Sequence, residues 1–278
     1  MRSRASAPAA SSELEEHPMD KILAAVDGAV ATITFNNPER HNAVSLDMWK
    51  AVLAALDRFA ADPAVRVLVV TGAGGKSFVS GADISKFEDE RASEAAVAEY
   101  DEATESVYKT LLAYAKPTIA KIRGYCIGGG MNLAICCDLR ISNEAARFAV
   151  PAAKLGLGYG MTRVKRVLDI VGPQFAKEIF FTARQFDAAE AKVMGLVNRV
   201  VPDGELDAFV ADYAATIGGN APLTVHSIKR IIGEALKDPD ARDLALCDRL
   251  VKACFESEDY KEGRRAFMEK RKPAFTGR

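Results

Sequence analysis

Three consecutive glycines at positions 128–130 are the residues of this sequence that point most directly to chemistry. Glycine accepts a positive φ and lets another atom approach the backbone, and the first N–H groups of a following helix lack internal acceptors. Such a turn can bind an oxyanion or a phosphate. No Gly-Lys-Ser/Thr follows, and no Gly-x-Gly-x-x-Gly frame contains the turn, so the phosphate-loop patterns fail. The sequence favours an oxyanion site, with a purely structural tight turn as the alternative.

The segments around the glycines should form a strand, the turn and a buried helix. An apolar run at 118–123 precedes Gly124, and apolar residues from Met131 to Ile135 follow the glycines. Further strands are expected at 22–26 and 29–35, joined as a hairpin by Asp27-Gly28, and at 66–71 and 139–142. The expected helices cover residues 45–62, 92–115, 161–170, 173–181, 188–194, 206–217, 222–235 and 244–255. Strands alternating with helices, then helices alone, predict an α/β fold with a parallel core and a helical C-terminal section.

Composition excludes several classes of protein. The chain of 278 residues has a net charge of −1, so neither nucleic acid nor a membrane surface is expected as a partner. Five cysteines, two of them adjacent at 136 and 137, indicate reduced core thiols, so we expect a cytoplasmic protein. The three histidines lie far apart without companion ligands, so no metal site is predicted. Residues 1–18 lack apolar periodicity and should form a disordered tail.

Five separated stretches carry a family pattern through their order and spacing. They are Phe35 to Ala43 (FNNPERHNA), Phe78 to Ile84 (FVSGADI), Gly124 to Asp138, Ala188 to Val197 (AAEAKVMGLV) and Phe267 to Arg271 (FMEKR). Through them, residues 19–278 resemble the enoyl-CoA hydratase/isomerase, or crotonase, family. The resemblance implies a ββα-spiral core over 19–205 and a helical trimerisation region over 206–278. It also implies an acyl-CoA substrate, no cofactor beyond the coenzyme A of that substrate, and a homotrimer or a hexamer.

In the family that the chain resembles, two backbone amides hold the thioester oxygen as it becomes an enolate. The motif match places them at Ala82 and Gly129. The alternative for Ser80 to Ile84 is an ordinary strand-edge turn. By resemblance, the residues that bind CoA or substrate are Arg40, His41, Ala43, Ala82, Asp83, Ile84, Ser85, Gly129, Ala152, Phe267 and Lys270. Lys270-Arg271-Lys272 can also be a solvated basic end of the chain.

The sequence departs from the hydratase pattern at two positions. Hydratases of this family carry two glutamates, and the matching residues here are Asn132 and Ala152. An amide and a methyl group cannot activate water or protonate carbon, so we expect a poor hydratase. Asn132 can instead hold a water or a polar group of the substrate, or be a helix residue satisfied locally.

Tyr159 is the candidate for proton transfer. It lies in Leu155-Gly156-Leu157-Gly158-Tyr159, a pattern similar to the loop of malonyl-type decarboxylases of the same superfamily, although it can also be a structural aromatic. Lys154 and Arg163 are further candidates that could meet a substrate carboxylate. Three functions stay open: a lyase or isomerase that uses the oxyanion hole, a decarboxylase of a malonyl-type CoA thioester, and a non-catalytic acyl-CoA-binding protein.

Overall fold

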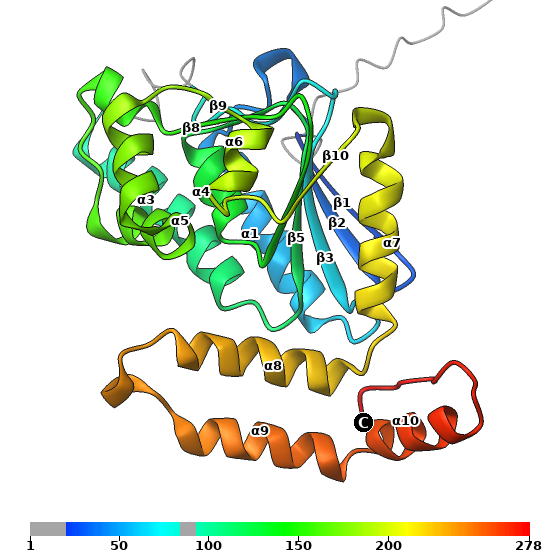
Figure 1. Cartoon of the computed structure of the whole chain (residues 1–278). Coiled ribbons are helices and arrows are strands. Elements are labelled where there is room, and N and C mark those ends of the chain that lie inside the picture. Colours follow the sequence, from blue (N-terminus) through cyan, green and yellow to red (C-terminus); the bar gives the residue numbers. More distant parts are fainter. Residues whose placement is uncertain (1–20, 84–92) are drawn as a thin grey trace, which may run out of the picture.

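The structure, a computed structural model, describes residues 21–83 and 93–278 (Figure 1). The expected tail at 1–18 and the expected CoA contacts Ile84 and Ser85 lie outside these residues. The described chain is a mixed α/β fold with two sheets. Both the predicted fold class and its parallel core are therefore confirmed.

The larger sheet has six strands in the order β1-β2-β3-β5-β7-β10. Its first two strands form the predicted hairpin, in which Gly28 takes a φ of 55°. The pairs from β2 to β10 are parallel, and β3 is buried along nearly its whole length. The strands are β1 (Ile22–Asp27), β2 (Val30–Phe35), β3 (Val67–Gly72), β5 (Thr118–Ile122), β7 (Leu139–Asn143) and β10 (Arg199–Val201).

The smaller sheet has four short strands, none of which was predicted. They are β4 (Ser77–Val79), β6 (Tyr125–Ile127), β8 (Arg147–Ala149) and β9 (Phe186–Asp187), in the order β4-β6-β8-β9. The prediction that the strand at 118–123 leads directly into the glycine turn is wrong. The chain bends at Gly124, where φ is 67° and a Cβ would lie 1.9 Å from the Lys76 carbonyl oxygen, and then crosses to the other sheet as β6. Strands of two or three residues are too short to show a period of two in the sequence.

The predicted helices are present, and one more follows the last of them. The helices are α1 (Leu46–Ala61), α3 (Glu94–Leu112), α4 (Gly129–Ile135), α5 (Met161–Thr182), α6 (Ala188–Val193), α7 (Leu206–Gly218), α8 (Pro222–Ala235), α9 (Leu244–Glu256) and α10 (Glu258–Met268). Gly172, with φ 73° and ψ 171°, interrupts α5, and Pro173 starts its second half as the sequence predicts. Ser257 ends α9 and caps α10 by accepting a hydrogen bond from Tyr260 N–H.

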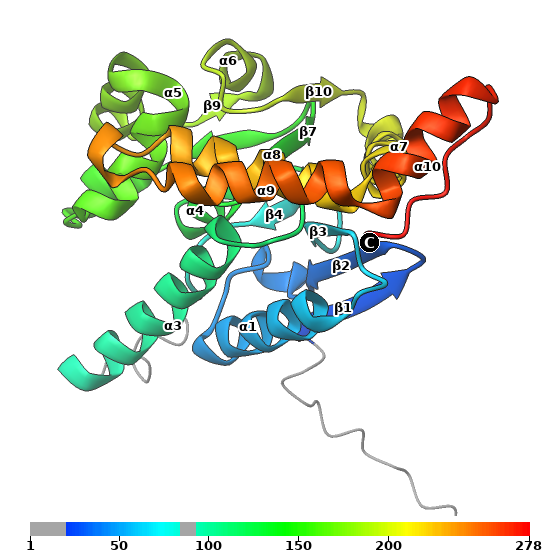
Figure 2. The same ribbon diagram turned by 90° about the horizontal axis from the view of Figure 1, so that it is seen from below.

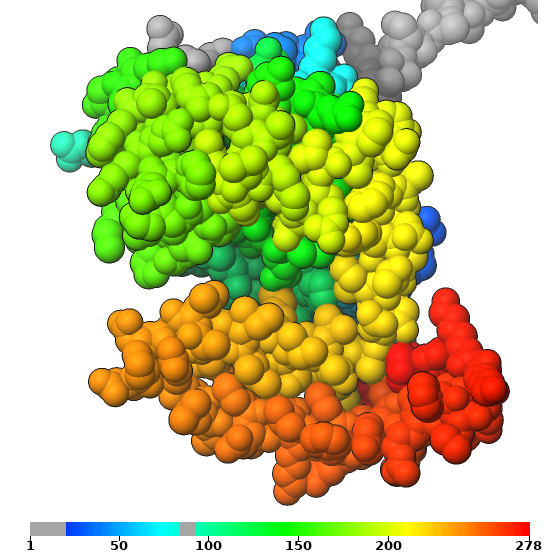
Figure 3. All heavy atoms as spheres, viewed as in Figure 1, coloured from blue at the N-terminus to red at the C-terminus, as the bar shows by residue number. Residues whose placement is uncertain are grey.

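Helix α7 covers one face of the large sheet, where Leu206, Val210 and Ala214 pack on Val67 and Ile119. The main core lies on the other face, under α1, α3 and α4. Helices α8, α9 and α10 form an arm beneath this body (Figures 2 and 3). No helix within residues 21–83 and 93–278 is long and apolar enough to cross a membrane.

The prediction of five core thiols holds for only three of them. Cys126, Cys136 and Cys137 are free and buried, and burial raises the pKa of the Cys136 thiol to about 12. Cys247 and Cys254 are free but only partly buried, because they lie on α9 in the arm.

Candidate active site

Two glycine-bearing segments meet at the ends of neighbouring parallel strands. Gly81 follows β4, and Gly129 begins α4 directly after β6 and Gly128. A Cβ on Gly81 would lie 3.9 Å from the Gly129 nitrogen, and a Cβ on Gly129 would lie 3.7 Å from the Gly81 Cα. The segments that carry the predicted amides of Ala82 and Gly129 are therefore in close contact.

Both of these amides lack an acceptor within the described part of the chain. Neither Ala82 N–H nor Gly129 N–H donates a hydrogen bond to a described residue. Both residues are half-buried. Two unused donors on segments in contact are the type of arrangement that can bind a carbonyl oxygen or an oxyanion.

The glycines of the turn are required by its geometry. Gly128 takes φ 56° and ψ −112°, a region that L side chains rarely adopt, while its N–H donates to the Ala149 carbonyl at 2.8 Å. A Cβ on Gly130 would lie 2.0 Å from the carbonyl oxygen of Val79 in β4. The start of α4 can therefore approach β4 only because Gly130 has no side chain.

The segment that contains Arg40, His41 and Ala43 runs alongside residues 80–83. Val44 N–H donates to the Gly81 carbonyl at 2.9 Å, and Asp83 N–H donates back to the Val44 carbonyl at 3.1 Å. The guanidinium of Arg40 lies 3.5 Å from the Asp83 carboxylate, which is almost fully buried while Arg40 is largely exposed. Two of the sequence segments matched to CoA binding are thus brought together beside the free Ala82 amide.

Asn132 and Tyr159 are also brought together, although 26 residues separate them in the sequence. Asn132, only 2% exposed on α4, donates through Nδ2 to the Tyr159 hydroxyl and to the Gly128 carbonyl. Its Oδ1 is buried and has no hydrogen-bond partner among the described residues. The Asn132 amide is therefore only partly hydrogen-bonded within the protein, and its Oδ1 can accept a hydrogen bond from a water or a ligand.

The state of the Tyr159 phenol follows from its surroundings. Burial raises its pKa, against the opposing effects of the Asn132 hydrogen bond and of the positive charges of Arg163 and Arg166. The phenol is therefore protonated at neutral pH. Because its oxygen accepts from Asn132, its own proton is left to donate to another group.

Three further predicted residues, Ala152, Lys154 and Arg163, differ in exposure and in their partners. Ala152 is buried in a short 3-10 helix (Pro151–Leu155), and Lys154 in the same turn is exposed. Arg163 already pairs with Asp101 of α3 at 3.1 Å, so its role as a receptor for a substrate carboxylate stays a prediction. No three His, Cys, Asp or Glu side chains gather as metal ligands within the described residues.

Phe267 and Lys270 are not brought to the site within one chain. Phe267, 82% exposed, lies on α10, and Lys270 follows that helix with a φ of 53°. Helix α10 lies at the far end of the arm, well away from α4 in both ribbon views (Figures 1 and 2). The predicted contact of these two residues with CoA stays a prediction.

Sequence reasoning missed Tyr108. Its hydroxyl, on α3, donates to the Gly129 carbonyl at 2.9 Å. In the sequence Tyr108 is one aromatic residue on the apolar face of an expected helix, 21 residues before the turn that it contacts. Nothing local distinguishes such a residue from an ordinary core aromatic.

Comparisons with known proteins give one consistent family. The model of the family described as enoyl-CoA hydratase/isomerase matches residues 25–278. A crotonyl-CoA hydratase of Syntrophomonas wolfei is 36% identical over 92% of this chain and 98% of its own length. A short-chain-enoyl-CoA hydratase of Clostridium acetobutylicum is 35% identical over 91% of this chain and 97% of its own length. Among solved structures, an enoyl-CoA hydratase/carnithine racemase of Magnetospirillum magneticum superimposes with a TM-score of 0.89 at 39% identity, covering 94% of this chain and 97% of that one.

Proposed function

Because this chain belongs to the enoyl-CoA hydratase/isomerase family, we propose that it binds an acyl-CoA thioester and stabilises the enolate of that thioester between the N–H groups of Ala82 and Gly129. Enolate formation is shared by lyase and isomerase reactions of acyl thioesters. The observation that supports the proposal is the contact between Gly81 and Gly129, next to two backbone N–H groups, of Ala82 and Gly129, that donate no hydrogen bond within the described residues. Donors that are fixed before charge develops are the main source of such stabilisation.

Tyr159 supplies the proton in this proposal. Its phenol is protonated at neutral pH, is oriented by Asn132 and has its O–H free to donate. Asn132 itself offers Oδ1 as an acceptor for a water or a substrate hydroxyl. The glutamates that hydratases place at the positions of Asn132 and Ala152 are replaced by neutral groups, so hydration is slow.

A second candidate is decarboxylation of a malonyl-type CoA thioester. The positive charges of Arg163 and Arg166 act on the phenol of Tyr159, and the residues at 132 and 152 bring no negative charge that would repel a substrate carboxylate. The bond between the α-carbon and the carboxylate breaks, carbon dioxide leaves, and the electron pair forms the same thioester enolate. Tyr159 then protonates the α-carbon, and solvent returns a proton to the phenolate.

The test is a side-by-side assay of the purified protein with crotonyl-CoA and methylmalonyl-CoA. A third arm follows exchange of α-protons of a saturated acyl-CoA in D₂O, which reports enolate formation without any leaving group. We expect slow hydration, and loss of carbon dioxide if the second candidate holds. Exchange of α-protons is expected only if a base other than the protonated Tyr159 removes them. CoA binding without turnover or exchange would contradict enolate chemistry and favour an acyl-CoA-binding protein.

Replacing Tyr159 with phenylalanine should lower turnover by about 10²-fold, because a positioned acid contributes about 10²–10⁴-fold. The ring and its contact with Phe180, at a centroid distance of 5.1 Å, remain. KM should change little. Tyr213→Phe on α7, where the ring stacks on Phe209, is the matched control and should retain full activity.

The pH profile is the companion measurement for Tyr159. The reaction requires the protonated phenol, and a raised pKa extends the protonated form to higher pH, so kcat/KM should stay flat through neutral pH and fall only at alkaline pH, above the usual pKa of a tyrosine. A catalytic carboxylate would instead give an acidic limb near its own pKa. An unchanged rate for Tyr159→Phe, or an alkaline limb that persists in that variant, would refute this role.

The arm supports the proposed trimer or hexamer. Helices α8, α9 and α10 line a groove of about 630 Å³ with Ile228, Val251 and Phe255 among its walls. In an assembly, the arm of one copy can bring Phe267 and Lys270 to the CoA bound by a second copy. Within one chain these two residues lie far from the proposed site. Light scattering that reports a monomer would contradict this assembly. We propose no cofactor beyond the coenzyme A of the substrate.

A further inference from the structure

The carbonyl groups on both sides of Gly129 are held by donors from two helices. The Gly128 carbonyl accepts from the backbone N–H of Asn132 at 3.1 Å and from Asn132 Nδ2 at 3.3 Å. The Gly129 carbonyl accepts from the hydroxyl of Tyr108 at 2.9 Å. Gly129 is therefore held through both of its peptide groups.

Holding these carbonyls also fixes the direction of an N–H group. The Gly128 carbonyl and the Gly129 N–H belong to one planar peptide group, so the direction of the first determines that of the second. Gly129 has no Cβ, so its own sterics allow a wider range of φ and ψ than any other residue would have. Three successive glycines therefore need partners outside the turn to keep one orientation.

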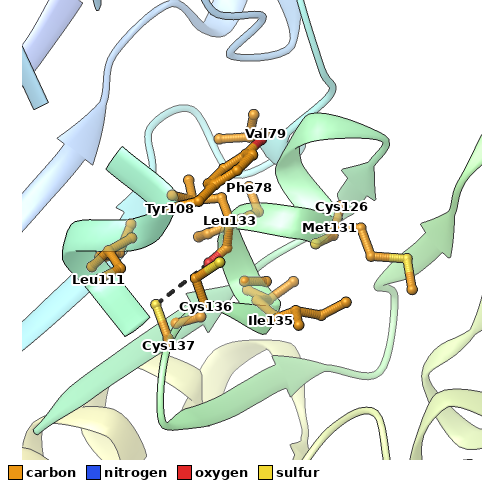
Figure 4. Packing of buried hydrophobic residues seen from close by; sticks show 14 of the residues in the cluster. Phe78, Val79, Tyr108, Leu111, Cys126, Met131, Leu133, Ile135, Cys136 and Cys137 are labelled. Carbon is orange, nitrogen blue, oxygen red and sulfur yellow. Dashed lines mark hydrogen bonds between the residues drawn. The ribbon is translucent and has the colours of Figure 1, made fainter. Parts of the chain in front are cut away.

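Tyr108 is well suited to be such a partner because its own side chain is fixed. It is 1% exposed, its ring meets Trp49 edge-on at a centroid distance of 5.6 Å, and the Arg166 guanidinium lies 5.2 Å from its ring centre. Figure 4 shows Tyr108 reaching from α3 into the packing beside Phe78 and Leu133. Burial raises the pKa of the Tyr108 phenol well above its usual range, so the hydroxyl remains a donor at neutral pH.

We propose that Tyr108 is a positioning residue for enolate stabilisation. Asn132 holds the Gly128 carbonyl, whose peptide group carries the Gly129 N–H, and Tyr108 holds the next peptide group through the Gly129 carbonyl. With both of its peptide groups held, Gly129 keeps its N–H directed toward the thioester oxygen before charge develops. The Asn132 bonds to the Gly128 carbonyl also polarise the peptide group that carries the Gly129 N–H, which strengthens that donor. The inference rests on the proposed function, since it assigns Tyr108 a part in the same site.

The test compares Tyr108→Phe with Tyr114→Phe. Tyr114 is a matched control, because its buried hydroxyl also donates to a backbone carbonyl, that of Leu56, at 2.9 Å and away from the glycine turn. One readout is the absorbance of bound cinnamoyl-CoA or hexadienoyl-CoA, which moves to longer wavelength when the carbonyl oxygen accepts strong hydrogen bonds. The second is kcat and KM for the best thioester, and the third is Tm.

For Tyr108→Phe we expect a fall in kcat of about tenfold with little change in KM, a smaller effect than the 10²–10³-fold that follows removal of a whole donor. The spectral shift should shrink in parallel. Tyr114→Phe should lower Tm by a similar amount and leave kcat and the shift unchanged. A Tyr108→Phe protein that keeps both the wild-type kcat and the wild-type spectral shift would overturn the inference. Equal losses of kcat and of the spectral shift in the two variants would also overturn it. Absence of any shift or turnover in the wild-type protein would instead refute the proposed function itself.

Discussion

Substitution of Gly81 by alanine should reduce turnover of any acyl-CoA thioester by at least about 10²-fold, the effect of removing one donor from an oxyanion site. The added methyl group would lie 3.6 Å from the Ile127 carbonyl and 3.9 Å from the Gly129 nitrogen, within the space between the two proposed donors. Gly81 also has a φ of 113°, which an L side chain rarely adopts, and holding such strain costs about 1–3 kcal/mol. The peptide that carries Ala82 N–H should therefore rotate.

The effect of Gly81→Ala is measured as kcat/KM, as CoA affinity and as Tm. Gly28→Ala is the control, because Gly28 also has a positive φ, with nothing within 4 Å of its missing Cβ, but lies in the β1–β2 hairpin. It should lose some stability and keep its activity. Turnover within threefold of wild type in Gly81→Ala would show that the donors lie elsewhere.

The double substitution Asn132→Glu with Ala152→Glu should increase the rate of crotonyl-CoA hydration by about 10²-fold or more, since a positioned acid or base contributes about 10²–10⁴-fold. Both positions are buried, so the new carboxyl groups will have raised pKa values that favour proton transfer near neutral pH. Part of this gain will be offset by the loss of the Asn132 hydrogen bonds to Tyr159 and Gly128.

The matched control for this gain is Asn132→Gln with Ala152→Gln, which adds the same bulk without ionisable groups. It should show no increase in hydration, followed through the loss of the enoyl absorbance. A folded Glu variant that binds crotonyl-CoA but hydrates it no faster than wild type would show that these two positions do not limit hydration.

The elements that the sequence predicted well are those with a long apolar period. The helix expected at 222–235 has the same bounds as α8, and the hairpin about Gly28 is present, because both signals are local. The three-residue strands β4, β6 and β8 carry no such period, and their pairing depends on residues far along the chain. Close approaches beside these strands, such as that of Gly130 to Val79, are likewise visible only in the folded chain.

The site was predictable where a motif carries it and not where it depends on contacts between segments. The resemblance marked Ala82, Gly129, Asn132 and Tyr159, but the hydrogen bond between Asn132 and Tyr159 joins a helix to a loop 27 positions away. Tyr108 belongs to no sequence motif. Its proposed role depends on one hydrogen bond, from its hydroxyl to the Gly129 carbonyl, that only the folded structure shows.

The small sheet has a consequence for how this pocket can diversify. The paired strands β4 and β6 lead into the Ala82 and Gly129 segments, and Gly130 of α4 packs closely on Val79 of β4. Residues 132, 152 and 159 lie on α4 and in the loop after β8, outside those strands. We expect descendants of this chain to differ at residues 132, 152 and 159, and therefore in the reaction. Strands β4 and β6 and the glycines that follow them should stay the same.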